Sequence, residues 1–227
     1  MNILEKLKGA KNVMRCYREG VELLASQNTD IKDFDDKFLI ESQDLTWSFP
    51  FVARAIKKRQ TKLILLEPQK PEVFAGMQGD YINREYCEKN DIRITPFPTQ
   101  GGAVLVNKGD ILLICIHPMK KGAFLDFIQP KIMNYLADQN GVKFVSQKGN
   151  DIMVNGKKLS GASTSYRMGM VTEGIFINGV DNKDIDVLGH KGKKREVISL
   201  DGLAVDLKAF RKWLIETVNE WEHKHER

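Results

Sequence analysis

The sequence predicts an α+β fold with a mixed or antiparallel central sheet flanked by helices. Short apolar runs bounded by turn residues crowd the middle of the 227-residue chain, and such runs are typical of strands. Longer stretches with apolar residues at helical spacing lie before, between and after them. Hydrophobic residues make up 42% of the chain, which is enough to form a core between such layers.

The composition argues against several classes of protein. No apolar run approaches the roughly 20 residues that a helix needs to cross a bilayer, so no membrane span is expected. Charged residues stand between Met1 and Asn12, where a secretory signal has an apolar core, so a cytoplasmic protein is expected. Cys16, Cys87 and Cys115 form no CxxC pair, so neither a zinc knuckle nor a disulfide framework is predicted.

The formal net charge of +5 favours an acidic partner. Such a partner is an acidic protein, a nucleotide or a nucleic acid. Basic residues cluster at 57–59 and at 191–195. No signature of stacking aromatic residues accompanies the second cluster, so a nucleic acid is the least expected of the three partners.

The first forty or so residues are predicted to form a separate arm. Apolar side chains at helical spacing predict a helix over residues 2–24. A stop is expected at Asn28-Thr29-Asp30, and a polar, acidic stretch typical of a surface connection continues through Asp36. We therefore expect an N-terminal helical arm over residues 1–45 and a globular domain over residues 46–227.

The domain is predicted to begin with alternating helices and strands. A short helix is expected over residues 51–58, with Pro50 at the first helical position, where a missing N–H costs nothing. Residues 63–66 form an apolar run that suits a buried strand. A helix over residues 82–89 and a short strand over residues 92–94 are expected next.

The middle of the chain is predicted to be rich in strands. The apolar runs 103–106 and 111–116 are joined by Asn107-Lys108-Gly109-Asp110, which predicts a hairpin. Residues 124–136 carry an apolar stripe and are predicted to form a helix. Pro130 inside this helix predicts either a kink or a late start.

Strands are predicted again in the last third of the chain, over residues 143–146, 151–154 and 174–178. Asn155-Gly156 is a strong signal for a two-residue hairpin, because both residue types tolerate positive φ. Residues 205–221 are predicted to close the domain as an amphipathic helix.

Two glycine-containing segments are candidates for ligand binding. Pro98 to Ala103 directly precedes a predicted strand, and its paired glycines let the backbone approach a bound anion closely. A plain glycine turn is the alternative for this segment. In the second segment, Gly149 to Gly161, a lysine held beside a glycine supplies the fixed cation needed where a carboxylate meets a phosphate. The alternative there is an exposed hairpin with solvated lysines.

Taken together, these segments resemble the lipoate–protein ligase branch of the biotin/lipoate cofactor transferase family. The resemblance rests on the order of QGGAVLVNKGDILL, an amphipathic helix, NDIMVNGKKLSGAS and EGIFIN. The stretches PEVFAGMQ and NREYC upstream, and VISL before the last helix, are similar to further parts of the family pattern. The resemblance covers roughly Thr46 to Trp221 and implies the catalytic domain of that family.

The resemblance implies a two-step reaction. The carboxylate of lipoate, or of octanoate or biotin, attacks the α-phosphate of ATP and forms an acyl-adenylate, with Mg²⁺ accompanying the ATP. A lysine of an acceptor protein, such as an acidic lipoyl domain, then attacks the mixed anhydride. Lys158 matches the family's central lysine and is the expected catalytic residue, because its charge would stabilise both transition states.

The resemblance also implies a set of binding residues. Asn150 and Asp151 match the pair near the adenylate, and Asp151 is the expected Mg²⁺ ligand. The other expected binding residues lie in the glycine loop, the KLSG motif and the EG strand: Gly101, Gly102, Ala103, Ser160, Gly161, Glu173 and Gly174. An apolar tunnel for the acyl chain is expected along Val104, Leu112 or Ile114.

Two differences from the family pattern motivate a second hypothesis. Pro96 and Phe97 stand where the family often has arginines, so Arg93 or Arg167 is expected to substitute as a phosphate-facing cation. Glu173 replaces a histidine and is expected to add negative charge beside ATP. The second hypothesis is therefore a non-catalytic or octanoyl/lipoyl-transferase relative that binds an acyl or adenylate ligand, or a partner protein.

A thioester mechanism is disfavoured. Acyltransferases of the same fold use a cysteine nucleophile, and the corresponding place near Lys143-Phe144 holds none. Cys87 and Cys115 are expected to be small core residues. A basic nucleic-acid binder is the third and weakest hypothesis.

Overall fold

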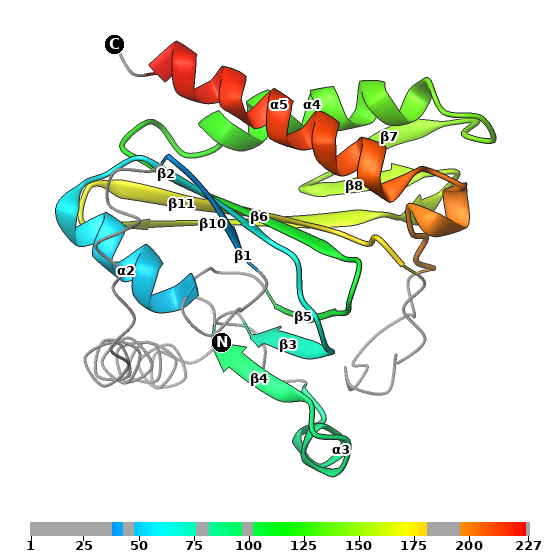
Figure 1. The fold of residues 1–227 in the computed structure, drawn as a ribbon, viewed down its shortest axis with the longest axis horizontal. Helices are drawn as coiled ribbons and strands as arrows, with labels where there is room; N and C mark the ends of the chain where they lie inside the picture. The colour runs from blue at the N-terminus through cyan, green and yellow to red at the C-terminus, as the bar shows by residue number, and fades with distance from the viewer. Residues whose placement is uncertain (1–37, 43–47, 76–81, 97–101, 181–195, 226–227) are drawn as a thin grey trace.

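A computed structural model describes residues 38–42, 48–75, 82–96, 102–180 and 196–225 (Figure 1). Their largest sheet has five strands in the order β1-β2-β6-β11-β10. The strands of this central sheet are β1 Leu39–Ser42, β2 Lys62–Leu66, β6 Ile111–His117, β11 Met170–Ile177 and β10 Ser160–Arg167. β1 and β2 run parallel, and the other neighbours are antiparallel. The predicted α+β class with a mixed central sheet is confirmed.

Both faces of the central sheet are covered. α4 (Ala123–Ala137) and α5 (Leu207–His225) lie over one face, and α2 (Ser48–Lys58) lies against the other (Figure 1). Every residue of β2 and β6 is therefore buried, which explains why residues 63–66 and 111–116 are continuous apolar runs. Trp221 of α5 packs edge-on against Phe124 of α4, with 5.4 Å between the ring centroids.

A second sheet lies on the side of α2, away from α4 and α5 (Figure 1). Its strand order is β4-β3-β5, with β3 at Glu72–Ala75, β4 at Arg93–Pro96 and β5 at Ala103–Val106. α3 (Arg84–Lys89) leads from β3 to β4, and the side chain of Asn83 caps it by accepting the N–H of Tyr86 at 3.0 Å. Phe74 and Val106 of this sheet pack in one apolar cluster with Ile114 of the central sheet.

The predicted hairpin between β5 and β6 is wrong, because the two strands enter different sheets. The connecting residues do form a turn, in which the N–H of Asp110 donates to the carbonyl oxygen of Asn107 at 3.0 Å. The buried Asp110 carboxylate accepts the N–H of Asn107 at 2.7 Å and the N–H of Gly179 at 2.8 Å. The turn is thereby tied to the chain just after β11 and forms a corner between two sheets.

A third sheet carries most of the second glycine-containing segment. Its order is β7-β8-β9, with β7 at Val145–Lys148, β8 at Asp151–Val154 and β9 at Lys157–Lys158. The two-residue hairpin at Asn155-Gly156 is confirmed, with φ of 50° and 80° at the two positions. The hairpin holds Lys158 opposite Met153 of β8.

The other elements predicted between residues 51 and 221 are confirmed with shifts of a few residues. The last helix begins at Leu207, after a 3₁₀ turn at Asp201–Leu203. α4 begins at Ala123 and continues through Pro130, so the alternative of a late start is wrong. β1, β3 and β10 are strands that the sequence analysis does not predict. None of the described helices combines the length and apolar character that crossing a membrane requires.

Most of the predicted N-terminal arm lies outside the described residues, as does the basic cluster at 191–195. Residues 39–42, which fall within the predicted arm, are described. They form β1, in which Leu39 lies opposite Leu63 of β2 in the central sheet. This part of the expected arm therefore belongs to the main sheet.

Candidate functional site

Lys158 and Asp151 meet on one side of the third sheet. Ile152 and Val154 of β8 face the core formed with α4 and α5, so by alternation Asp151 and Met153 face the other side. The ammonium Nζ of Lys158 lies 2.9 Å from Oδ1 of Asp151. The two side chains are 29% and 15% exposed, so they form a partly buried ion pair that a ligand can reach.

The ammonium of Lys158 lies over Gly161 of β10. A Cβ atom at Gly161 would lie 3.1 Å from Nζ of Lys158 and 3.5 Å from Oδ1 of Asp151. A side chain at this position would require the ammonium to move by a few tenths of an ångström, so the glycine leaves room for the ammonium where it lies. The structure thus brings together three of the residues singled out from the sequence, and it places the lysine beside a glycine as expected.

Hydrogen bonds on both sides fix the backbone of Lys158. Its N–H donates to the carbonyl oxygen of Glu196 at 2.9 Å, and its own carbonyl oxygen accepts the N–H of Ile198 at 3.0 Å. The side-chain amide of Asn178 donates to the same oxygen at 3.4 Å. The position of the ammonium therefore depends only on the torsions of the lysine side chain.

Amide side chains hold the turn that carries Asn150 and Asp151. Gln129 of α4 is buried and donates from Nε2 to the carbonyl oxygen of Asn150 at 3.0 Å. Its Oε1 accepts from Nε2 of Gln147 at 3.0 Å, and Nδ2 of Asn150 donates to the carbonyl oxygen of Ala162 at 3.4 Å. Sequence reasoning misses both glutamines. A polar residue within the apolar stripe of a helix is the signal that points to the first one.

Ser160 supports the site from the interior. Its side chain is buried, and Oγ accepts the N–H of Ile152 at 3.2 Å. The hydroxyl oxygen therefore joins β10 to β8. This corrects the expectation that Ser160 contacts the ligand, because in a strand it faces the opposite way from Gly161.

Small residues continue from the ammonium along the central sheet. Gly161 and Ser163 project from the same face of β10, and Gly174 of β11 lies opposite Ser163. On this face, Phe176 lies opposite Gly161 and packs in one apolar cluster with Ile114. The ammonium thus stands at the end of a face that carries small residues beside an apolar cluster, which suits an acyl chain.

The residues expected to line an acyl tunnel share that face. Leu112 and Ile114 are buried members of the cluster between the central sheet and α2, and Val104 packs against it while partly buried. Gly102 is exposed before β5, and Ala103 begins that strand and is half-buried. Gly101 lies outside the described residues. Ligand contacts of this loop stay a prediction.

Glu173 faces the protein interior. Its fully buried carboxylate accepts the N–H groups of Gly122, Phe124 and Leu125 at the beginning of α4, the last two at 2.9 Å. Free N–H groups and the helix dipole stabilise a negative charge at this position. The expectation that Glu173 adds charge beside ATP is wrong, because alternation in β11 turns its side chain toward α4.

A buried histidine accompanies this carboxylate. Burial by itself would raise the pKa of Glu173, but the nearby His117 imidazole and the N–H groups of Leu125 and Gly122 outweigh it and lower the pKa. Nδ1 of His117 accepts the N–H of Met119 at 3.2 Å, so the Nε2 that lies 3.6 Å from Glu173 carries the proton. His117 and Glu173 are thus part of the core.

The two arginines expected to substitute as phosphate-facing cations are placed elsewhere. Arg93 makes a two-point ion pair with Glu72 of β3, with Nε and Nη2 each 2.7 Å from a carboxylate oxygen. Arg167 ends β10, at the opposite end of the strand from Gly161 and about 20 Å away. Among the residues that the structure describes, Lys158 is therefore the cation found at the candidate site.

The described cysteines are core residues, as expected. Cys87 and Cys115 are both buried. Burial raises the pKa of the Cys115 thiol well above its ordinary value, and the charge of Glu173 raises it further. A thiolate is therefore disfavoured at this position, which argues against a cysteine nucleophile there.

The donor set for a metal is small. In the described parts of the chain, no group of three or more metal-binding side chains comes together. Asp151 is a single carboxylate, and one of its oxygens forms the ion pair with the ammonium of Lys158. Mg²⁺ bound to a nucleotide commonly takes only one or two protein carboxylates, so Asp151 fits that mode and does not fit a resident metal centre.

Comparison with protein families matches residues 50–219 to the lipoyl protein ligase A/B catalytic domain. The chain belongs to this family. The matched region begins in α2 and ends in α5, so it contains the second and third sheets and all strands of the central sheet except β1. The resemblance inferred from the sequence motifs is confirmed.

Two relatives in this family are lipoate–protein ligases. Lipoate–protein ligase 2 of Staphylococcus aureus is 38% identical over 86 residues, which are 36% of this chain and 25% of that protein. The lipoate–protein ligase of Streptococcus pyogenes is 36% identical over 101 residues, which are 42% of this chain and 28% of that protein. The matched region thus spans about a quarter of each relative.

Solved structures of lipoyl ligases share the fold. LipL1 of P. falciparum in complex with lipoate has a TM-score of 0.66 at 14% identity, over 82% of this chain and 62% of that chain. The bi-partite lipoate protein ligase of Thermoplasma acidophilum, described with its E2 lipoyl domain, has a TM-score of 0.62 at 19% identity, over 82% of both chains. These likenesses support the α+β architecture described above.

Proposed function

We propose that this chain activates lipoate, or a similar acyl acid, with ATP and transfers the acyl group to a lysine of an acceptor protein. The observation that carries the proposal is the position of the Lys158 ammonium. It lies over Gly161, at the end of a sheet face that carries small residues beside an apolar cluster. Membership of the lipoyl ligase family and the names of the two bacterial relatives support it.

In the first step, a carboxylate oxygen of the acid attacks the α-phosphorus of ATP. The bond from that phosphorus to the bridging oxygen of the β-phosphate breaks, and pyrophosphate leaves. Lys158 stabilises the charge that builds on the phosphate oxygens, as a point charge held in position. Asp151 orients the ammonium before the substrates bind. Mg²⁺ brought with ATP would neutralise phosphate charge, with Asp151 as its protein ligand.

In the second step, the amine of the acceptor lysine attacks the carbonyl carbon of the acyl-adenylate. The bond from this carbon to the phosphate oxygen breaks, AMP leaves, and the amine loses a proton. The ammonium of Lys158 stabilises both the carbonyl oxygen and the departing phosphate. The turn held by Gln129 and Asn150 keeps Asp151 in place during both steps.

The apolar face indicates which acid fits. A hydrocarbon chain gains free energy from burial beside Phe176 and Ile114. The ureido ring of biotin has N–H and C=O groups that cost free energy when they are buried without partners. Lipoate and octanoate are therefore the expected substrates, and biotin is expected to be a poor one.

The test is ATP–pyrophosphate exchange with lipoate, octanoate and biotin in turn. We expect exchange with lipoate or octanoate, and at least a 100-fold loss in Lys158→Ala, in line with removal of a preorganised charge. Lys157→Ala is the matched control, since Lys157 precedes Lys158 in β9 but pairs with Glu196 at the surface. Absence of exchange with every acid contradicts the proposal.

A relative that binds ligand without turnover is the second candidate. It is favoured by the positions of the two arginines, since Arg93 is paired with Glu72 and Arg167 lies at the far end of β10. Calorimetric titration with a non-hydrolysable acyl-adenylate analogue separates the two candidates. Binding without exchange supports the second candidate, and no binding excludes it.

A further inference from the structure

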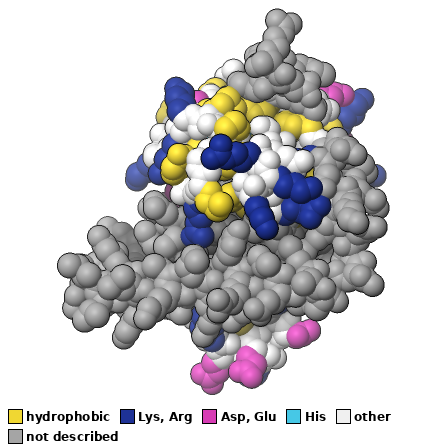
Figure 2. Space-filling model, turned by 90° about the vertical axis from the view of Figure 1, so that its left-hand side faces the viewer, with side chains coloured by type: hydrophobic (Ala, Val, Ile, Leu, Met, Phe, Trp, Pro, Cys, Tyr) yellow, Lys and Arg dark blue, Asp and Glu magenta, His cyan; other side chains and the backbone are white. Residues whose placement is uncertain are grey.

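Exposed cations surround exposed apolar side chains at one end of the central sheet. At this end of the sheet β2 begins, β6 ends and β10 turns into β11, and α2 ends just before β2. Figure 2 faces this end of the sheet and shows dark-blue Lys and Arg side chains beside yellow hydrophobic ones. We name this set the basic corner, and its members are Lys57, Arg59, Lys120, Lys121, Tyr166, Arg167 and Met168.

The apolar members of the basic corner are unusually exposed. Tyr166 is 67% exposed and Met168 is 66% exposed, and they are two of the four large hydrophobic residues that are exposed in the described chain. The end of α2 is close by, because a Cβ atom at Gly169 would lie 3.7 Å from Nη2 of Arg59. Apolar side chains ringed by charge are typical of the centre of a protein interface.

The charge of the basic corner is not compensated within the described residues. No ion pair there involves any of its five lysines and arginines, whereas Arg93, Lys131 and Arg211 each face a glutamate. The adjoining stretch of α4 contributes one exposed carboxylate, Asp126. A cluster of one sign attracts a partner of the opposite sign and speeds its association.

β10 connects the basic corner to the candidate site. It is one of the two edge strands of the central sheet, and its residues Gly161 to Thr164 are partly exposed. Gly161 and Arg167 project from the same face, about 20 Å apart. A folded domain of about 100 residues has a radius of gyration of about 13 Å. One such domain can therefore touch the basic corner while its lysine reaches Lys158.

We propose that the basic corner is the docking surface for the acceptor domain and that it recognises an acidic surface beside the acceptor lysine. This inference rests on the proposed function for the identity of the partner. The exposed Tyr166 and Met168 favour a protein partner, because apolar side chains ringed by charge are typical of protein interfaces. Surfaces that bind single-stranded nucleic acid commonly carry several stacking aromatic residues, and the basic corner has one.

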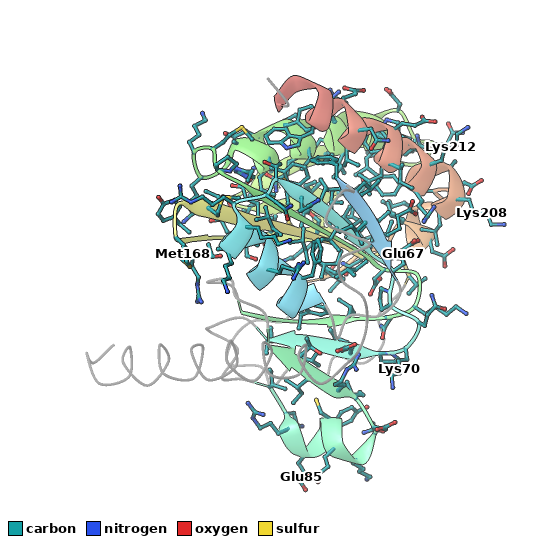
Figure 3. All side chains as sticks on the ribbon, turned by 60° about the vertical axis from the view of Figure 1, so that its left-hand side comes forward. Glu67, Lys70, Glu85, Met168, Lys208 and Lys212 are labelled. Atoms are coloured by element: carbon teal, nitrogen blue, oxygen red, sulfur yellow. The ribbon has the colours of Figure 1, made fainter. Side chains whose placement is uncertain are left out.

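The binding test compares two full-length double variants of equal charge change. Lys120→Glu with Lys121→Glu reverses the basic corner, and Lys208→Glu with Lys212→Glu is the matched control on α5. Figure 3 shows Lys208 and Lys212 on the opposite side of the molecule from Met168. Each variant is titrated calorimetrically with a lipoyl domain of net negative charge, at low and at high salt.

We expect the basic-corner variant to bind the lipoyl domain at least about 10-fold more weakly at low salt, and the control to stay within two-fold of wild type. The difference should shrink at high salt, where surface charges are screened. Equal affinities of the two variants overturn the inference. So does a chain that binds an RNA or DNA duplex and does not bind the lipoyl domain.

ATP–pyrophosphate exchange on the same variants separates this inference from the proposed function. Exchange needs no acceptor, so both variants should keep it. If the wild type binds the domain at the basic corner but shows no exchange, the proposed function fails and the docking surface stands. If exchange proceeds and both variants bind alike, the docking surface fails.

Tyr166→Ala should weaken binding equally at both salt concentrations, and unchanged affinity contradicts the apolar contribution.

Discussion

The ammonium nitrogen of Lys158 lies directly beside Gly161, 3.1 Å from the position that a Cβ atom would take there. The two residues come from different sheets, since Lys158 lies in β9 and Gly161 lies in β10. Their closeness makes the position of the charge depend on the absence of a single methyl group. This relationship can be tested without removing the charge itself.

Gly161→Ala is expected to lower ATP–pyrophosphate exchange about 10-fold or more, because misplacing a catalytic group by a fraction of an ångström is costly. The free energy of unfolding should stay within about 1 kcal/mol of wild type, since the flexible lysine can move away. Thr164→Ala, on the other face of β10, is the control and should keep full exchange. Full exchange in Gly161→Ala would falsify the proposed position of the ammonium.

Asp151→Asn is expected to lower the rate of exchange about 10-fold or more, because the ammonium loses the partner at 2.9 Å that orients it. Stability should change by less than about 1 kcal/mol, since both side chains are reachable by solvent. Steady-state exchange at several ATP concentrations checks this. A tighter ATP affinity with an unchanged maximal rate would instead show that Asp151 competes with phosphate for the lysine.

Glu173→Gln is expected to destabilise the fold by about 3 kcal/mol at neutral pH, because a buried charge that accepts three N–H groups of α4 is removed. The folded pKa of Glu173 is lowered, so its contribution is complete above the unfolded value and fades as the pH falls through the folded value. Urea unfolding between pH 3 and 7 measures this loss of stability, because that range extends to both sides of the ordinary carboxyl pKa of about 4.3. A role beside ATP would instead weaken nucleotide binding and leave stability unchanged.

The carboxyl of Asp110 is expected to make the free energy of unfolding change with pH in the opposite direction from Glu173. Burial raises its pKa from 3.8 to about 6, against the hydrogen bonds from Asn107, Gly179 and Val180. The folded state therefore binds this proton more tightly, and the free energy of unfolding falls by about 3 kcal/mol as the pH rises from about 4 to about 6. Comparing wild type with Asp110→Asn isolates the effect. A difference that stays constant over this pH range contradicts the prediction.

Local sequence patterns predicted the buried strands β2 and β6 and the helices α2, α3, α4 and α5. β2 and β6 are covered on both faces, so residues 63–66 and 111–116 are apolar without interruption and mark them as strands. The Asn155-Gly156 hairpin was predictable because few residue pairs tolerate its backbone angles. β10 was not predictable in this way, because its sequence SGASTSYR has no apolar alternation and pairing with β11 decides its conformation.

Pairing between distant segments explains the wrong predictions. β5 and β6 follow each other closely in sequence, but Asp110 binds backbone N–H groups at the end of β11 and turns the chain into another sheet. Glu173 was expected beside ATP, and only its register in β11 shows that it faces α4. Gln129 enters the site because α4 packs against the turn before β8.

The amino-acid order alone determined the α+β class, the family resemblance and the choice of Lys158, because these depend on local composition and on the spacing of short motifs. The tertiary structure decided which motif residues share a site. It places Lys158 beside Asp151 and Gly161, and it places the side chain of Glu173 in the core. The physical reason is that the face a strand residue occupies depends on register with neighbouring strands, which are far away in sequence.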